Sequence, residues 1–163
     1  VLLQNEISAV PHILRRAAEA GLSVWFNPSP MDDGALACEL SLVSVFLLNE
    51  IEGEQLTGTA EPGAILDRMA EKYPQAAVVL TLGAAGAWYA KGGARVFCPA
   101  EKAEAVDTTA AGDTFTGYFL RGMLDGRTPE EALRLAARAS AIAVSRPGAS
   151  PSIPRFSEVE RGL

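Results

Sequence analysis

Short apolar runs alternate with amphipathic segments along the first half of the chain. The segments VLLQN, LSVWFN, VSVFLL and AAVVLTL predict strands at 1–5, 22–27, 43–48 and 76–82. Helical patterns fill the intervals and predict helices over 8–20, 32–40, 49–58 and 62–73. Strands that are apolar throughout and separated by helices are typical of a parallel sheet covered on both faces. The predicted fold class is therefore α/β, a doubly wound, mostly parallel sheet with helices on both faces.

The pattern changes in the second half of the chain. AWYAK and ARVFC alternate around Gly92 and Gly93, which predicts a hairpin. Two long helices are predicted over 111–124 and 129–144, the second opened by a capping box of Thr128 and Glu131 with Pro129 at the first helical position. The tail RPGASPSIPRF predicts a loop before a final turn.

Length and composition indicate one folded domain over residues 1–163. Apolar residues make up 48% and charged residues 21%, which is ordinary for globular proteins and excludes disorder or a coiled coil as a starting hypothesis. The first strand begins at once, at Val1 rather than at a Met, so we expect the chain to be a fragment of a longer protein.

Charge and cysteine content exclude several function classes. The net charge of −6 argues against a nucleic-acid partner, because such binding needs Lys and Arg to neutralise phosphates. No apolar segment is long enough to predict a membrane span, and the absence of a secretory leader predicts a cytoplasmic protein. Two Cys, at 38 and 98, and one His provide neither a disulfide framework nor a zinc site, so we expect two buried thiols.

The segment DTTAAGDTF contains the strongest candidate chemistry. Ala110, Ala111 and Gly112 precede Asp113 at the predicted start of the 111–124 helix. Small side chains let an anion approach the backbone N–H groups, and a helix start contributes roughly half a positive charge there. A carboxylate at this position stays ionised and can accept a proton, although a lone Asp at a helix start is more often a simple cap.

Other catalytic signatures are absent from the sequence. It contains no GxGxxG motif, and Tyr118 stands where a P-loop requires Lys. His12 lies on a predicted helix without a nucleophile at a useful spacing, so we interpret it as a surface or packing residue.

DTTAAGDTF resembles the second signature of the ribokinase-like (PfkB) carbohydrate kinases, written DTxGAGD. The segments NPSP at 27–30, NEIE at 49–52, TLGAAG at 81–86 and RPGASPS at 146–152 resemble further motifs of this family in order and spacing. The resemblance covers essentially the whole chain, and implies the C-terminal nucleotide-binding and catalytic half of such a kinase.

The resemblance implies a role for each motif. Asp113 would be the general base, and Ala110, Ala111 and Gly112 the anion hole. The nucleotide ATP would be bound by Asn49, Thr81, Gly83, Ala84 and Gly86. Glu52 would hold Mg²⁺ through water, and Glu6 would bind sugar hydroxyls beside Asp113. A monovalent cation, K⁺, would lie among Asp107, Thr109, Ala143, Gly148 and Ser152.

The same resemblance implies what the chain lacks. The family's N-terminal half, its Gly-Gly sugar segment and its β-sheet lid, through which these kinases often form homodimers, have no counterpart here. The implied reaction is ATP-dependent phosphorylation of a sugar hydroxymethyl group, with ribose as the first choice and fructose, a keto-deoxy sugar or a nucleoside as alternatives. A non-catalytic nucleotide-binding domain is the alternative from another class. In either case we expect the chain alone to be nearly inactive.

Overall fold

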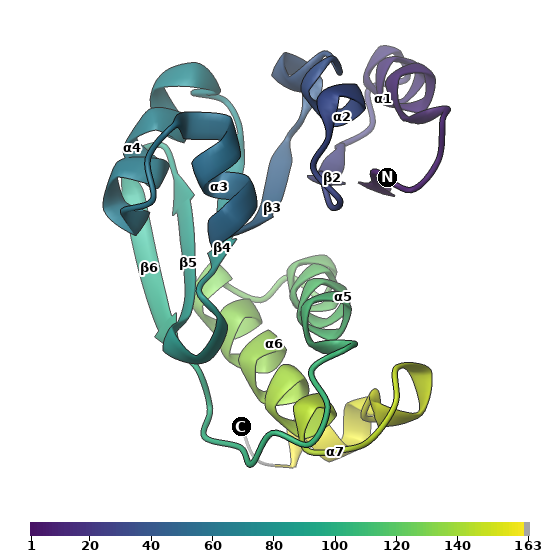
Figure 1. The fold of residues 1–163 in the computed structure, drawn as a ribbon, viewed down its shortest axis with the longest axis vertical. Coiled ribbons are helices and arrows are strands. Elements are labelled where there is room, and N and C mark those ends of the chain that lie inside the picture. Colours follow the sequence, from purple (N-terminus) through teal and green to yellow (C-terminus); the bar gives the residue numbers. More distant parts are fainter. Residues whose placement is uncertain (162–163) are drawn as a thin grey trace. The chain divides into compact units, whose positions relative to one another are not determined.

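The computed structural model describes residues 1–161 and contains one six-stranded sheet with the strands in chain order, β1 to β6 (Figure 1). The strands are β1 (Leu2–Gln4), β2 (Trp25–Asn27), β3 (Val45–Asn49), β4 (Ala77–Thr81), β5 (Gly86–Lys91) and β6 (Ala94–Pro99). The α-helices are α1 (Val10–Glu19), α2 (Asp33–Leu36), α3 (Glu50–Thr57), α4 (Pro62–Lys72), α5 (Ala111–Leu124), α6 (Pro129–Val144) and α7 (Phe156–Glu160). Three short 3₁₀ segments occupy Leu40–Leu42, Gly83–Ala85 and Ser150–Ser152.

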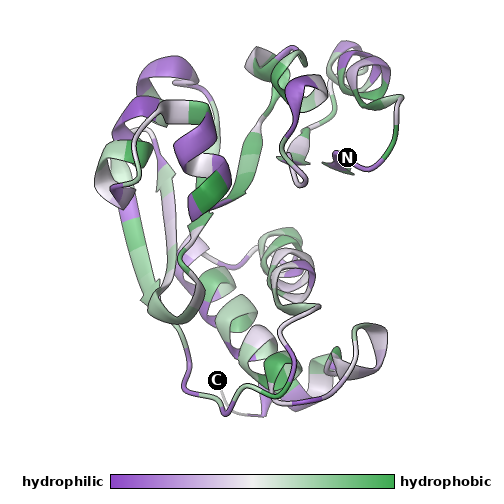
Figure 2. Ribbon diagram, in the orientation of Figure 1, coloured by the Kyte–Doolittle hydropathy of each residue, from purple (hydrophilic) through white to green (hydrophobic). Residues whose placement is uncertain are grey.

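The first four strands are parallel, which confirms the predicted α/β class. β3 and β4 are buried along their lengths, and Figure 2 shows β3 as almost uniformly hydrophobic. The two-residue turn at Gly92 and Gly93, both with positive φ, joins β5 to β6. So short a turn joins antiparallel strands, because a parallel pair needs a crossover of a dozen or more residues.

Contacts divide the chain into two compact units. Unit 1 comprises Val1–Leu82 and Trp88–Arg95, and unit 2 comprises Gly83–Ala87 and Val96–Leu163. The hairpin strands β5 and β6 have residues in both units. Two compact units can belong to one domain or to two, so the single domain over residues 1–163 stays a prediction.

Unit 1 has an extensive apolar core between its sheet and helices α1, α3 and α4. Phe26 and Phe46 are completely buried in it, and the Phe46 ring lies 4.9 Å from that of Tyr73. The predicted helix over 32–40 differs clearly from the structure. Helix α2 ends at Leu36 and a separate 3₁₀ turn follows, which buries Leu40 in the core.

Unit 2 is built on the hairpin of helices α5 and α6. The two helices approach closely at Gly122, where a Cβ would lie 2.9 Å from that of Ala132. Val159 of α7 packs with Leu135 and Ala139 of α6, all without exposed surface. The capping box of Thr128 and Glu131 opens α6 as predicted.

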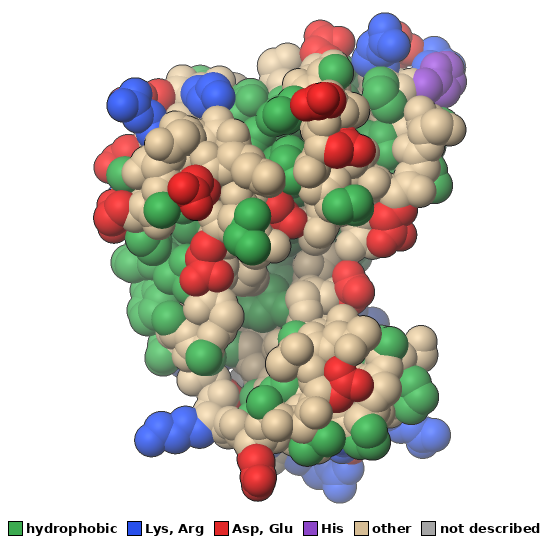
Figure 3. All heavy atoms as spheres, in the orientation of Figure 1, with side chains coloured by type: hydrophobic (Ala, Val, Ile, Leu, Met, Phe, Trp, Pro, Cys, Tyr) green, Lys and Arg blue, Asp and Glu red, His purple; other side chains and the backbone are tan. Residues whose placement is uncertain are grey.

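No helix among residues 1–161 is both long enough and apolar enough to cross a membrane. Figure 3 shows one face of the molecule, on which acidic side chains are spread over both units. This distribution agrees with the net charge of −6.

Candidate functional site

The carboxyl ends of the parallel strands in unit 1 bring together two of the predicted nucleotide-binding residues. Asn49 ends β3, Thr81 ends β4, and the two residues are paired in the sheet. The Thr81 hydroxyl donates a hydrogen bond to the Leu48 carbonyl at 3.2 Å. Glu6 is exposed just beyond the end of β1, with β2 between it and β3 in the strand order. Ligands of open α/β sheets bind at this edge.

Asn49 and Glu52 are held to each other by a reciprocal capping box. The Glu52 carboxylate accepts hydrogen bonds from the Asn49 backbone N–H at 2.9 Å and from its Nδ2 at 3.1 Å. In return, the Glu52 N–H donates to Asn49 Oδ1 at 2.9 Å. Glu52 is only 4% exposed, so this charged group is buried with its donors in place.

The turn after β4 and the first residue of β5 contain three more predicted nucleotide-binding residues, all in unit 2. Gly83 has φ of 51° and Ala84 lies in the 3₁₀ turn. Gly86 has φ of 130°, and a Cβ there would overlap the Cys98 carbonyl oxygen. The close approach of the backbone to β6 is thus sufficient to require glycine at this position.

Helix α5 begins at the position that the DTTAAGDTF segment predicts. Ala110 is its N-cap, and Ala111, Gly112 and Asp113 form its first turn, with the Asp113 side chain exposed. First-turn N–H groups have no partner within a helix. The Ala111 N–H donates to the Thr108 carbonyl at 3.1 Å, whereas a Cβ at Gly112 would meet no atom within 4 Å, so an anion can approach the backbone there. Ser140 of α6 donates to the Ala111 carbonyl at 3.2 Å, which fixes the helix start against α6.

One residue deeper in α5 lies a buried hydroxyl that the sequence analysis did not identify. Thr114 is 3% exposed, and among residues 1–161 its Oγ1 is the buried side-chain oxygen without a hydrogen-bond partner. Leaving a buried hydroxyl unpaired costs about 1–3 kcal/mol of stability, so such groups are rare in native structures.

The Asp107 carboxylate connects three of the predicted cation-binding residues. Its Oδ1 accepts from the Thr109 N–H at 2.9 Å and from the Thr109 hydroxyl, and its Oδ2 accepts from the Gly148 N–H at 2.9 Å. These bonds, the Thr109 hydroxyl first, lower the pKa of Asp107 below its usual range. Ala143, also predicted, lies in the last turn of α6, and Ser152 is buried with its hydroxyl donating to Ala149 at 2.7 Å.

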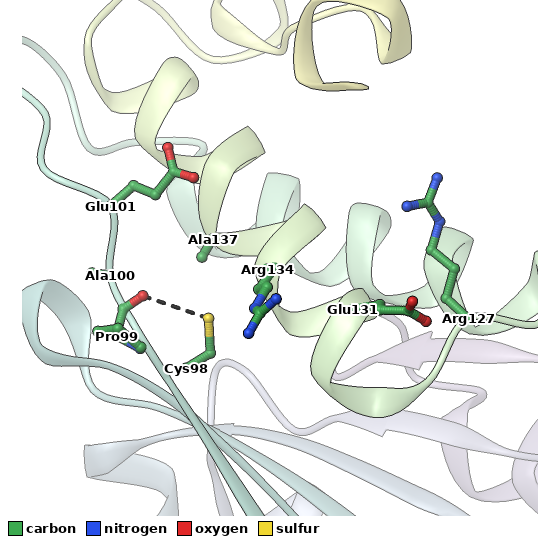
Figure 4. A pocket seen from close by; sticks show the side chains of 8 residues that line it. All are labelled: Cys98, Pro99, Ala100, Glu101, Arg127, Glu131, Arg134 and Ala137. Atoms are coloured by element: carbon green, nitrogen blue, oxygen red, sulfur yellow. Dashed lines mark hydrogen bonds between the residues drawn. The ribbon is translucent and has the colours of Figure 1, made fainter. Parts of the chain in front are cut away.

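Unit 2 also contains a cavity of about 610 Å³ between the end of β6 and α6, which the sequence did not indicate (Figure 4). Its apolar part is formed by Cys98, Pro99, Ala100 and Ala137. Four charged residues, Glu101, Arg127, Glu131 and Arg134, complete the lining. Desolvation raises the pKa of the Cys98 thiol, which donates to the Pro99 carbonyl at 3.5 Å. Both cysteines are buried and free, as expected.

The predicted site residues belong to both units. Glu6, Asn49, Glu52 and Thr81 lie in unit 1, and the others lie in unit 2. Within residues 1–161, no group of three or more His, Cys, Asp or Glu side chains is arranged to hold a metal ion.

Comparison with known proteins defines the class to which this fold and these motifs belong. The sequence pattern of the pfkB family carbohydrate kinases matches residues 6–155, so the chain belongs to that family. Among its relatives is the ribokinase of Schizosaccharomyces pombe, 37% identical over 97% of this chain and 52% of the relative.

Solved ribokinase structures are similar to this chain along almost its whole length. The Arabidopsis thaliana ribokinase complexed with ribose and ATP has a TM-score of 0.86 and 31% identity, over 99% of this chain and 54% of that one. The Cryptococcus neoformans ribokinase in complex with ADP has a TM-score of 0.88 and 29% identity, over 99% of this chain and 59% of that one. The chain thus spans about half the length of the relatives it matches.

Proposed function

We propose that this chain supplies the nucleotide-binding and catalytic groups of a kinase that transfers the γ-phosphoryl group of ATP to the hydroxymethyl group of ribose. The observation that carries the proposal is the start of α5, where Asp113 shares the first turn with Ala111 and Gly112. A carboxylate beside first-turn N–H groups combines a proton acceptor with an anion-binding site.

In this proposal Asp113 is the general base. Its carboxylate accepts the proton of the sugar hydroxyl as that oxygen bonds to the γ-phosphorus, and the bond from phosphorus to the bridging oxygen breaks to release ADP. The N–H groups around Ala110, Ala111 and Gly112 stabilise negative charge on the transferred group. The hydrogen bond from Ser140 to Ala111 supports this role by holding the helix start in one position.

For the nucleotide, we propose Asn49, Thr81, Gly83, Ala84 and Gly86 as binding residues. The apolar part of the cavity at Pro99, Ala100 and Ala137 suits a flat purine base, and it adjoins Gly86 through Cys98.

Glu52 suits Mg²⁺ only through water, because both of its oxygens already accept hydrogen bonds from Asn49. Mg²⁺ usually keeps several waters in proteins, so this arrangement fits its chemistry. The ion would neutralise charge on the ATP phosphates.

A monovalent cation such as K⁺ is proposed next to Asp107. The Asp107 N–H donates to the Val144 carbonyl at 3.1 Å, which places this acidic residue against the C-terminus of α6. A helix C-terminus has a partial negative charge, which together with the ionised Asp107 carboxylate attracts a cation. The oxygens of Asp107, Thr109, Ala143, Gly148 and Ser152 are the proposed ligands.

Ribose is the proposed acceptor, with Glu6 binding its hydroxyls, because the relatives are ribokinases and the Arabidopsis structure contains ribose and ATP. Fructose, a keto-deoxy sugar or a nucleoside is the alternative within the family. The predicted homodimer and the predicted cytoplasmic location stay predictions.

The test replaces Asp113 by Asn. The chain is fused to the part of the S. pombe ribokinase that it does not match, and this fusion is the parent protein. Turnover and ATP affinity of the parent and the variant are measured with ribose. We expect Asp113→Asn to lower turnover by about 10²- to 10⁴-fold while ATP affinity stays nearly the same, because only the proton acceptor is lost. Asp125→Asn, at the other end of α5, is the matched control and should change neither value.

Unchanged turnover in Asp113→Asn would refute its assignment as the base. If the parent protein binds ATP but phosphorylates none of ribose, deoxyribose, fructose and nucleosides, a non-catalytic nucleotide-binding domain becomes the better hypothesis.

A further inference from the structure

The segment from Val144 to Gly148 is held at both ends by Asp107. The Val144 carbonyl accepts hydrogen bonds from the N–H groups of Val106 at 2.8 Å and Asp107 at 3.1 Å. The Gly148 N–H donates to the Asp107 carboxylate at 2.9 Å. The position of this segment therefore determines how Asp107 and Gly148 lie relative to each other.

Arg146, in the middle of this segment, is fixed by a partner outside it. Its guanidinium lies 2.6 Å from the carboxylate of Glu158 in α7, and the two side chains are only 37% and 32% exposed. The same carboxylate accepts from the Arg155 N–H at 2.8 Å and so also caps α7. A partly buried ion pair is screened less by solvent than a surface pair.

Helix α7 is itself anchored to the two long helices of unit 2 (Figure 1). The Tyr118 hydroxyl of α5 donates to the Pro154 carbonyl at 2.7 Å, and Arg138 of α6 donates to the Val159 carbonyl at 3.0 Å. Val159 is completely buried, and the ring of Phe156 stacks on that of Tyr118. Glu158 is thus a fixed point to which Arg146 is tied.

We propose that Arg146 and Glu158 are positioning residues that hold the 144–148 segment in the conformation that binds the monovalent cation. The inference rests on the proposed cation site beside Asp107, and adds to it a structural control of cation affinity. When the ion pair is broken, the segment keeps its bonds to Asp107 but loses its connection to α7. The cation must then order the segment as it binds, which lowers its affinity.

The experiment measures the thermal midpoint of this chain as KCl replaces choline chloride at constant ionic strength. The half-saturating KCl concentration is compared among the parent, Glu158→Gln, Arg146→Gln and the double variant. Gln at position 158 can still cap α7, so the change is directed at the ion pair. We expect each single variant to need about three- to fivefold more KCl, the effect of one moderately strong ion pair.

The double variant should need no more KCl than either single variant, because both changes remove the same interaction. Arg146→Lys keeps a positively charged side chain opposite Glu158, so its half-saturating KCl concentration should be close to that of the parent. Glu130→Gln is the matched control, since it breaks another 2.6 Å ion pair of unit 2, that with Arg134, without touching the segment. It should leave the half-saturating KCl concentration unchanged.

Each result decides between defined alternatives. If KCl does not stabilise the parent more than choline chloride does, the proposed cation site is wrong, and this inference fails with it. If KCl stabilises parent and variants with the same half-saturation, the cation site stands and the role of the ion pair is refuted. Arg146→Gln leaves the cap of α7 intact, so it tests the inference even if Glu158→Gln does not fold.

Discussion

Two helices of this protein open with the same local motif in different surroundings. At α3, Asn49 and Glu52 exchange hydrogen bonds where β3 ends, and Glu52 is 4% exposed. At α6, Thr128 and Glu131 exchange equivalent bonds, but both residues are exposed. Both caps satisfy the free N–H groups of a helix start.

The comparison shows how one motif can have two roles. The capping box of α6 is fully explained by its role in starting that helix. The α3 box holds a buried carboxylate against Asn49, which is paired with Thr81 at the edge of the sheet where ligands bind in this class of fold. Burial of a charged group is costly, so its presence there favours a role beyond capping.

The largest expected difference comes from removing the first residue of each box. Asn49→Ala removes the Nδ2 donor to a buried carboxylate and the Oδ1 acceptor that caps α3, but keeps the backbone N–H, so we expect the free energy of unfolding to fall by about 3 kcal/mol. Thr128→Ala removes an exposed cap and should cost about 1 kcal/mol. Urea denaturation of the two variants measures the difference. Equal losses would show that the burial of Glu52 does not distinguish the two boxes.

A smaller effect is expected when each Glu is replaced by Gln, which can still cap. Glu52→Gln loses one of two hydrogen bonds from Asn49 and should cost about 1 kcal/mol, whereas Glu131→Gln should cost less than about 0.5 kcal/mol. If Glu52 also binds the waters of Mg²⁺, its substitution should reduce the gain in ATP affinity on adding MgCl₂ by about tenfold. Titration of the chain with ATP, with and without MgCl₂, measures this gain. A gain that survives in Glu52→Gln would leave this residue a cap only.

The smallest effect is the pH dependence of the exposed box. Hydrogen bonds from Thr128, its backbone N–H first, lower the pKa of Glu131. A lowered pKa in the folded state gives stability that is present above the ordinary Glu value of about 4.3 and is lost as pH falls through the lowered value.

Asp32, Asp107 and Glu158 also have lowered pKa values and act in the same direction, so the difference between the parent and Glu131→Gln isolates Glu131. We expect the stability advantage of the parent to shrink from neutral pH to about pH 3 in urea titrations. A constant difference would contradict the cap as the cause.

Most of the fold could be predicted from local patterns. The bounds of α5 and α6 agree with the sequence, and the start of α6 is defined locally by its capping box and Pro129. The 32–40 segment was less predictable, since its backbone turns early to bury Leu40. The resemblance to a family indicated Asp113 and Asn49, but no local signal connected Arg146 to Glu158, twelve residues further on.

The α/β class, the helix starts and the motifs that assign the chain to its family can be recognised in the linear pattern, because they depend on spacings of a few residues. Three features emerge only in the folded chain: one capping box is buried and the other exposed, Gly86 faces the Cys98 carbonyl, and α7 is bound to the segment beside Asp107. These contacts join residues that are distant in the chain. Their energies depend on burial and on which groups face each other, and a linear pattern contains neither.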